Sequence, residues 1–290
     1  MRYRKTGVRW AWAVLFCGAV LAVAQDSSPA SETYCRGVNV ISVPSRPTVT
    51  SATDTTACGV VEVEYGLERQ WPGGGANRDD LTGGLRIGVT PNLDFRWSSS
   101  DFLHIMDGTP DRTIDRTTDR TGFGDTWLSL RYRFLKQTKR HPSLGVVYAV
   151  KAPSASAGLG FGAERVDHSL SFLASKDVHR LHFDFNLIEL MAGRPGASGF
   201  DHNDGFALAS WLTVTHRLSA VFEPYGYTEL NRNDPAFASA MIGGNYRVHP
   251  RLYLDGGLDV GATAAAPNKR VFVGITYAIG NVYSWLRPIQ

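Results

Sequence analysis

Apolar and polar residues alternate along most of this chain. In the stretch "DTWLSLRYRFL", residues 125–135, Leu128 and Leu130 alternate with Ser129 and Arg131. Successive side chains of a β-strand point to opposite faces, so this alternation predicts a strand with one apolar and one polar face. Amphipathic runs with the period of an α-helix are scarce. The pattern therefore predicts an all-β protein.

Segments of this kind recur between stretches rich in Gly, Pro, Asn and Asp, which are typical of turns and loops. The expected strands are 59–69, 81–90, 93–99, 123–134, 143–152, 168–176, 181–191, 204–214, 218–229, 236–246, 252–261 and 270–279. In 168–176, 204–214 and 218–229 the alternation is blurred, so the pattern leaves their facing open.

The connections between the expected strands alternate in length. The short ones are 90–92, 136–142, 176–180, 215–217 and 247–251, and the longer ones are 70–80, 100–122, 153–167, 192–203, 230–235 and 262–269. Bacterial outer-membrane barrels have short periplasmic turns and longer outside loops. We therefore expect a transmembrane up-and-down antiparallel β-barrel of about 12 strands over residues 59–279.

The lipid around such a barrel decides which face of a strand points outward. A one-residue slip in the strand that holds Arg131 and Arg133 would turn both side chains to lipid, at roughly 2–4 kcal/mol each near the midplane. We therefore expect Leu128, Leu130 and Tyr132 to face lipid.

An exported soluble sandwich or lipocalin-like barrel would produce the same alternation, with its apolar faces inward. The rhythm of short and long loops and the unbroken run of strands favour the membrane barrel. Glycines on the polar faces favour it too, because they leave room in a narrow lumen. These glycines are Gly66, Gly84, Gly88, Gly145, Gly257 and Gly274.

The amino terminus has the pattern of a secretory signal peptide. A basic start, "MRYRKTGVR", precedes the apolar run "WAWAVLFCGAVLAVA" and a small-residue site before Gln25. The apolar run is short for a membrane span, so we expect residues 1–24 to be removed, and a retained anchor is the alternative.

The leader also accounts for the basic balance of the chain. Lys and Arg number 30 against 27 Asp and Glu, and four of the basic residues fall before Gln25. The mature chain is nearly neutral, so its charge predicts no nucleic-acid partner.

Two cysteines remain in residues 25–58, which we expect to form an amino-terminal periplasmic segment. In an exported protein, Cys35 and Cys58 are expected to form one disulfide, with two free thiols as the alternative. A metal site is disfavoured, because neither cysteine has a C-x-x-C neighbour or a close histidine.

Enzyme and cofactor signatures are weak. Ser198 lies in "GASGF", which lacks the G-x-S-x-G order, although His202 and either Asp201 or Asp204 are near in sequence. The histidines are scattered, and the glycine runs lack the following helix that a phosphate site needs. We expect no catalytic residues, no metal and no cofactor.

Function is then expected to reside in the barrel interior, which the charged residues of the polar faces would line. The candidate lumen-lining residues are Glu62, Glu64, Arg86, Arg96, Asp125, Arg131, Arg133, Lys151, Asp184, Glu223, Asp255 and Asp259. Two readings stay open: the opposed charges orient a polar solute group, or they pair with one another and fill a small barrel.

Three stretches carry a resemblance to a family. "GFGDTWLSLRYRF" at 122–134, "HPSLGVVYAVKAPSAS" at 141–156 and "GGNYRVHPRLYLDGGLDVGATAAAPNKRVFVGITYAI" at 243–279 resemble the meta-pathway phenol-degradation family of outer-membrane transporters. The resemblance covers most of the chain from about Gly59. It implies a 12-stranded barrel that takes up or exports small, often hydrophobic or aromatic compounds. Its implied setting is the outer membrane.

The end of the chain departs from this family. Such barrels usually stop on an aromatic residue that the assembly machinery reads, whereas this chain continues past Tyr277 as "AIGNVYSWLRPIQ". Residues 280–290 are therefore expected either to extend the last strand or to form a tail.

The expected function is that of an outer-membrane channel or transporter for small molecules. Its expected partners are the lipid bilayer, a small-molecule solute and the outer-membrane assembly machinery. A closed barrel that displays loops 100–122 and 192–203 to an outside partner is one alternative. An outer-membrane hydrolase is another.

Overall fold

The structure is a computed structural model of the 290-residue chain, and it describes residues 35–72, 76–106, 119–156, 161–194, 198–230 and 234–285. The expected signal peptide, residues 1–24, lies outside the described residues.

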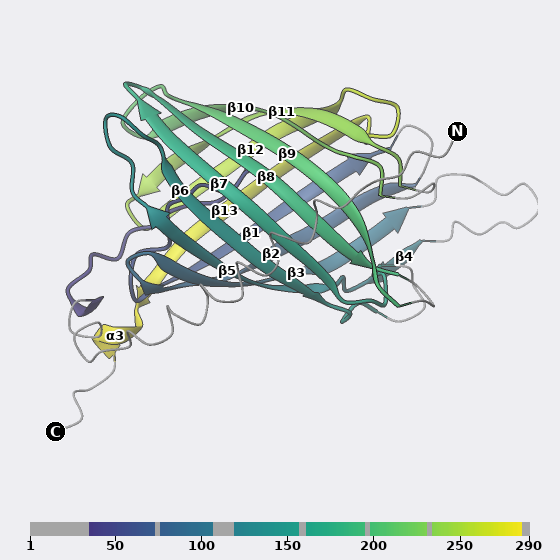
Figure 1. The fold of residues 1–290 in the computed structure, drawn as a ribbon, viewed down its shortest axis with the longest axis horizontal. Helices are drawn as coiled ribbons and strands as arrows, with labels where there is room; N and C mark the ends of the chain where they lie inside the picture. Colours follow the sequence, from purple (N-terminus) through teal and green to yellow (C-terminus); the bar gives the residue numbers. More distant parts are fainter. Residues whose placement is uncertain are drawn as a thin grey trace, which may run out of the picture.

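The described chain forms a closed antiparallel β-barrel (Figure 1). Its strands are β1 Val60–Trp71, β2 Asn77–Thr90, β3 Leu93–Met106, β4 Arg120–Gly122, β5 Thr126–Leu135, β6 Ser143–Ala152, β7 Asp167–Val178, β8 Leu181–Gly193, β9 Phe200–Thr213, β10 Leu218–Tyr227, β11 Phe237–His249, β12 Leu252–Gly261 and β13 Lys269–Asn281. Strand β1 pairs with β13, which closes the ring. Because β4 and β5 both pair with β3, they share one position, and the barrel has 12 strands.

The predicted fold class is therefore confirmed, and 143–152 and 252–261 coincide with β6 and β12. The strands that lead into long loops run further than predicted, as β3 does in reaching Met106. The reason is that the cross-strand ladder continues past the apolar band, where Arg69 of β1 forms an ion pair with Asp79 of β2. No helix among the described residues is long and apolar enough to cross a bilayer.

The outward faces are apolar, as the alternation predicts. Leu128 and Leu130 are 43% and 44% exposed, while Arg131, which follows Leu130 and faces the lumen, is only 5% exposed. Phe172, Phe206 and Phe222 are also exposed and settle the facing of β7, β9 and β10.

The blurred alternation of β9 and β10 has a physical cause inside the barrel. Their inward positions include Ala209 and Val221, which pack with Met241 and Phe272 in an apolar cluster that Trp211 joins. Both faces of these strands are apolar, so period two disappears from the sequence.

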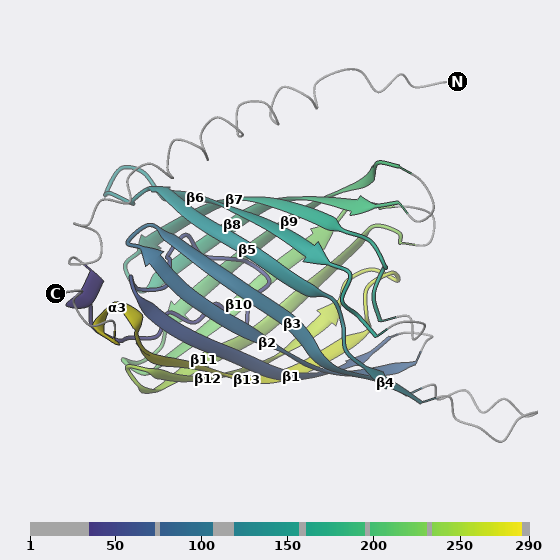
Figure 2. The same ribbon diagram turned by 90° about the horizontal axis from the view of Figure 1, so that it is seen from below.

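The amino-terminal part of the described chain runs inside the barrel, as Figures 1 and 2 show in purple. It starts at the end with the short turns, where α3, Val282–Trp285, also lies. Ser42, Thr50, Thr53 and Thr56 are buried in the lumen. Of the expected periplasmic segment, residues 25–58, the part up to 34 lies outside the described residues. Acceptor and donor groups on the barrel wall bind the backbone of the described part from Ser42 onward within the lumen.

Of the expected tail or strand extension, residues 280–290, the structure describes 280–285. Strand β13 extends to Asn281, beyond the predicted end at 279, and α3 follows it directly.

Candidate functional site in the barrel lumen

Cys35 and Cys58 are joined by a disulfide, and the residues between them form a closed loop that begins at the short-turn end and lies inside the barrel from about Ser42 onward. We call residues 36–57 the lumen loop. Asn281 of β13 donates hydrogen bonds from Nδ2 to the carbonyl oxygens of Cys35 and Cys58, at 2.7 and 3.2 Å. The base of the lumen loop is thus fixed at the short-turn end of the barrel.

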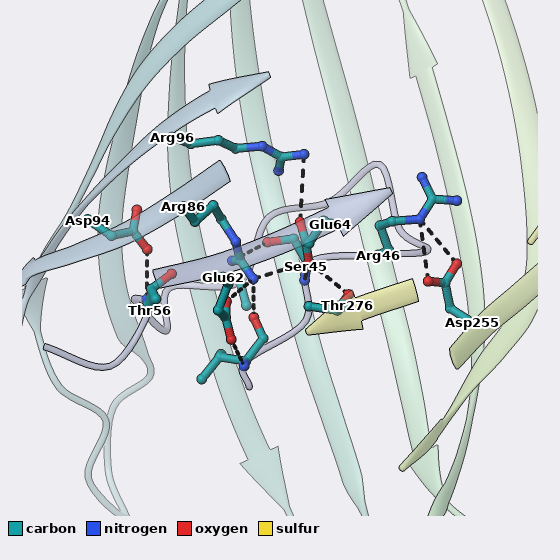
Figure 3. A network of polar contacts seen from close by, with 12 residues as sticks. Ser45, Arg46, Thr56, Glu62, Glu64, Arg86, Asp94, Arg96, Asp255 and Thr276 are labelled. Carbon is teal, nitrogen blue, oxygen red and sulfur yellow. Dashed lines mark hydrogen bonds and ion pairs between the residues drawn. The ribbon is translucent and has the colours of Figure 1, made fainter. Parts of the chain in front are cut away.

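Strands β1 and β2, close to where β1 pairs with β13 to close the barrel, bind the start of the lumen loop (Figure 3). The backbone N–H of Val43 donates to Glu62 Oε1 at 2.5 Å, and Arg86 Nη2 donates to the carbonyl of Val43. Arg86 also contacts Glu62 Oε2 at 2.6 Å and Glu64 Oε1 at 3.1 Å. All three charged side chains are at most 1% exposed, so each charge depends on its partners for stabilisation.

Glu64 is the second anchor of the lumen loop. Its Oε1 accepts hydrogen bonds from the backbone N–H of Ser45 at 2.6 Å and from Thr276 Oγ1 at 3.3 Å. The other oxygen, Oε2, accepts no hydrogen bond from the described residues and lies 3.7 Å from Arg96 Nη2. Arg46 of the loop reaches the opposite direction, toward Asp255 of β12, with Nε 3.3 Å from both carboxylate oxygens (Figure 3).

The far side of the lumen binds the middle of the loop. Glu223 of β10 accepts the backbone N–H groups of Val49 at 2.9 Å and Thr50 at 2.6 Å, and also the Thr50 hydroxyl. Asn186 of β8 forms two hydrogen bonds with the backbone of Ser51, at 2.7 and 2.8 Å.

Strand β5 binds the last part of the loop. Arg131 Nη1 donates to the carbonyl oxygens of Ala52 and Asp54 at 3.1 and 2.7 Å. Arg133 Nη1 forms an ion pair with the Asp54 carboxylate at 2.6 Å. Further contacts come from Ser175 and Asp94, which accept the backbone N–H groups of Thr53 and Thr56. Strands all round the barrel therefore hold the lumen loop, and it crosses the lumen.

The other candidate lumen residues form two ion-pair clusters away from the loop and one hydrogen-bonded group that reaches the loop through Ser175. Lys151 Nζ lies 3.4 Å from Asp125 and 2.5 Å from Asp167, near the long-loop end. Asp259 accepts from Arg270 at 2.9 Å and from Tyr225 Oη at 2.5 Å, and Arg270 also contacts Glu68 at 3.3 Å. Asp184 accepts hydrogen bonds from Ser175 at 2.6 Å and His182 at 3.0 Å.

Above the lumen loop, toward the long-loop end, lies a chamber of about 690 Å³. Most of its wall is apolar: Trp127, Val147, Ala149, Ile188, Leu190, Tyr227, Leu230, Pro235, Phe237 and Ala265 line it. Its polar lining includes Arg96, Ser98, Ser129 and Asn203. This volume is typical of small-molecule sites.

The sequence reasoning missed the chamber because it searched for charged residues on polar faces. An inward Val147 or Ile188 belongs to a strand that also carries apolar residues outward. The signal was a pair of consecutive apolar residues, Val146–Val147 in β6 and Leu187–Ile188 in β8, which interrupts the alternation. Two smaller cavities, of about 340 and 180 Å³, adjoin the lumen loop, and Arg96 and Arg46 line both.

The Ser-His-Asp arrangement that the hydrolase alternative would need is not formed among the described residues. His202 Nδ1 contacts Glu189 Oε1 at 2.5 Å, and Asp201 forms an ion pair with Arg194, whereas Ser198 is exposed. Across all the residues that the structure describes, no group of three or more His, Cys, Asp or Glu side chains is arranged to hold a metal ion.

The family model described as "Putative MetA-pathway of phenol degradation" matches residues 45–279. An outer-membrane channel from Pseudomonas putida F1 superimposes with a TM-score of 0.63 at 14% identity, over 80% of this chain and 100% of that channel. The NanC porin gives 0.51 at 11% identity, over 75% and 98%. No curated protein matches in sequence. At these identities the solved structures show a shared outer-membrane barrel fold.

Proposed function

Because the chain belongs to the family of that description, we propose that it is an outer-membrane channel or transporter for small apolar or aromatic molecules. The observation that carries this proposal is the apolar chamber inside a barrel whose candidate lumen charges, apart from Arg96, bind one another or the lumen loop. A lumen that served only to fill the barrel would not need a chamber of ligand size with aromatic walls.

The lumen loop gives the proposed channel a closed resting form. A solute that enters from the long-loop end reaches the chamber first and meets the lumen loop beneath it. Passage into the periplasm then requires the hydrogen bonds of Glu223, Asn186 and Arg131 to the loop to open. Each bond to a charged group contributes about 1.5–3 kcal/mol, so opening is infrequent without a bound solute.

The apolar outer surface of the barrel and the fold that it shares with outer-membrane channels support a location in the outer membrane. On this proposal the chain is exported through a cleaved signal peptide and inserted by the outer-membrane assembly machinery. It acts without catalysis, since its lumen groups bind the loop and form a chamber, and Ser198 lies apart from His202 in the hydrogen-bond network of the described residues.

Planar-bilayer recording with purified protein tests the proposal. We expect brief ion-conducting openings in wild type, and reversible block of that current when neutral benzamide is added to the long-loop side. Val147→Asp places a charge in the chamber wall and should weaken block about ten-fold, because the apolar ring must then contact a hydrated carboxylate.

The control is Ser219→Asp, which adds the same charge on the inward face of β10 outside the chamber lining. Benzamide should block the current of this variant as strongly as it blocks the wild-type current. A complete absence of current in folded wild-type protein would instead support a closed barrel that displays its loops.

A further inference from the structure

We infer that the chamber selects solutes with a carboxylate attached to a small apolar or aromatic body, and that Arg96 binds the carboxylate. The inference rests on the proposed function and specifies its substrate class. It is built on the position of Arg96, on its free donors and on the wall that faces it.

Arg96 occupies a central position in the lumen. It lies on β3, and its side chain lines the chamber and both smaller cavities next to the lumen loop. Its side chain is 29% exposed, while that of Arg86, its pairing partner on β2, is 1% exposed. Arg96 is therefore accessible from the chamber.

The guanidinium of Arg96 has unused hydrogen-bonding capacity. Within the described residues its one recorded polar contact is the 3.7 Å approach to Glu64 Oε2, which is longer than a hydrogen bond. Glu64 is bound more closely by Arg86 and by the backbone of Ser45. A guanidinium has five N–H donors arranged to bind a carboxylate with two parallel bonds.

The neighbouring arginines are already engaged. Arg46 binds Asp255, and Arg270 binds both Asp259 and Glu68. The contrast assigns the carboxylate to Arg96 and not to the arginine cluster as a whole.

Hydroxyl groups beside Arg96 complete a polar corner of the chamber. Ser129 is its cross-strand neighbour on β5, and Ser98 is the next inward residue on β3. Both line the chamber and can donate to an anion.

Two aromatic rings line the wall across the lumen from this corner, beside Thr228, Leu230, Asp234 and Pro235 of the connection between β10 and β11. Strands β10 and β11 lie opposite β3 in the strand order, and they contribute Tyr227 and Phe237. These two rings stack with centroids 5.4 Å apart. A carboxylate at Arg96 would thus place an attached ring in the apolar part of the chamber.

Calorimetric binding of benzoate and benzamide to the detergent-solubilised full chain tests the inference. The two probes have nearly the same shape and differ in charge. We expect wild type to bind benzoate more tightly than benzamide. The variant Arg96→Gln should lower the affinity for benzoate at least ten-fold, because a hydrogen bond to a charged group is lost. Its affinity for benzamide should change less than two-fold.

Arg78→Gln serves as the matched control, since Arg78 pairs with Asp80 near the long-loop end and does not line the chamber. It should leave both affinities unchanged, and Arg96→Lys should give an intermediate benzoate affinity. Heat-modifiable gel migration verifies that each variant is folded.

Equal binding of the two probes to wild type, or equal losses of both in Arg96→Gln, would overturn the carboxylate site. Because calorimetry does not require the channel to open, such a result leaves the bilayer currents intact. Conversely, tight benzoate binding without current would reject the channel and retain the site.

Discussion

At the scale of single residues, several of the charged side chains in the lumen bind the backbone of the lumen loop. Glu62, Glu64 and Glu223 each accept a backbone N–H of the loop, and Arg86 and Arg131 donate to its carbonyl groups. An extended chain inside a barrel has many unpaired backbone groups, and burying them without partners is costly. The wall residues supply those partners.

Glu223→Gln tests this role. The amide retains one acceptor but loses the charge, so the backbone N–H groups of Val49 and Thr50 should exchange with deuterium about ten-fold faster, as the difference between charged and neutral hydrogen bonds implies. Mass spectrometry of peptides covering 42–56 gives the rates. Asp167→Asn, at the other end of the lumen, is the control and should leave them unchanged. Equal rates in wild type and Glu223→Gln would show that the carboxylate does not hold the loop.

At the scale of elements, the alternation of apolar and polar residues predicted which side chains face outward in strands with one apolar and one polar face. It did not do so in strands whose two faces are both apolar. In β5, Leu128 and Leu130 outward with Arg131 inward follow from the pattern alone, because lipid and lumen demand different side chains. In β10, Val221 faces inward and Phe222 outward, and no periodicity distinguishes them. The path of the lumen loop was equally hidden, since its contacts join backbone groups to side chains far away in sequence.

Leu130→Arg should therefore cost about 2–4 kcal/mol of unfolding free energy near the bilayer midplane, because it turns a guanidinium to lipid. Ser129→Arg, one residue earlier and facing the chamber, should cost much less. Guanidinium chloride titration in lipid vesicles measures both. Similar losses in the two variants would contradict the outward assignment of Leu130.

At the scale of the whole molecule, the barrel and the lumen loop form one closed unit. The 12 strands leave no free edge around the ring, and the disulfide closes the loop at its base. A crosslink acts mainly on the undocked state, since it reduces the conformations that a released loop can adopt. For a loop of this length the effect is about 3 kcal/mol.

The double variant Cys35→Ser/Cys58→Ser should keep the barrel folded while its lumen loop leaves the lumen more often. Planar-bilayer recording should show a strongly increased open fraction, on the order of a hundred-fold, as the lost constraint implies. Unboiled samples should retain the fast gel migration of a folded barrel. An open fraction equal to that of the oxidised wild type would show that the crosslink has no part in holding the loop.

The contact of Asn281 with both cysteine carbonyls has a consequence for biogenesis. Asn281 ends the last strand, and that strand pairs with the first to complete the cylinder. The base of the lumen loop, which also pairs with β2 through Cys58 and Gly88, is thus completed when the carboxyl-terminal strand arrives. We therefore expect the contacts at the base of the lumen loop to be completed in the same event that joins the two ends of the sheet.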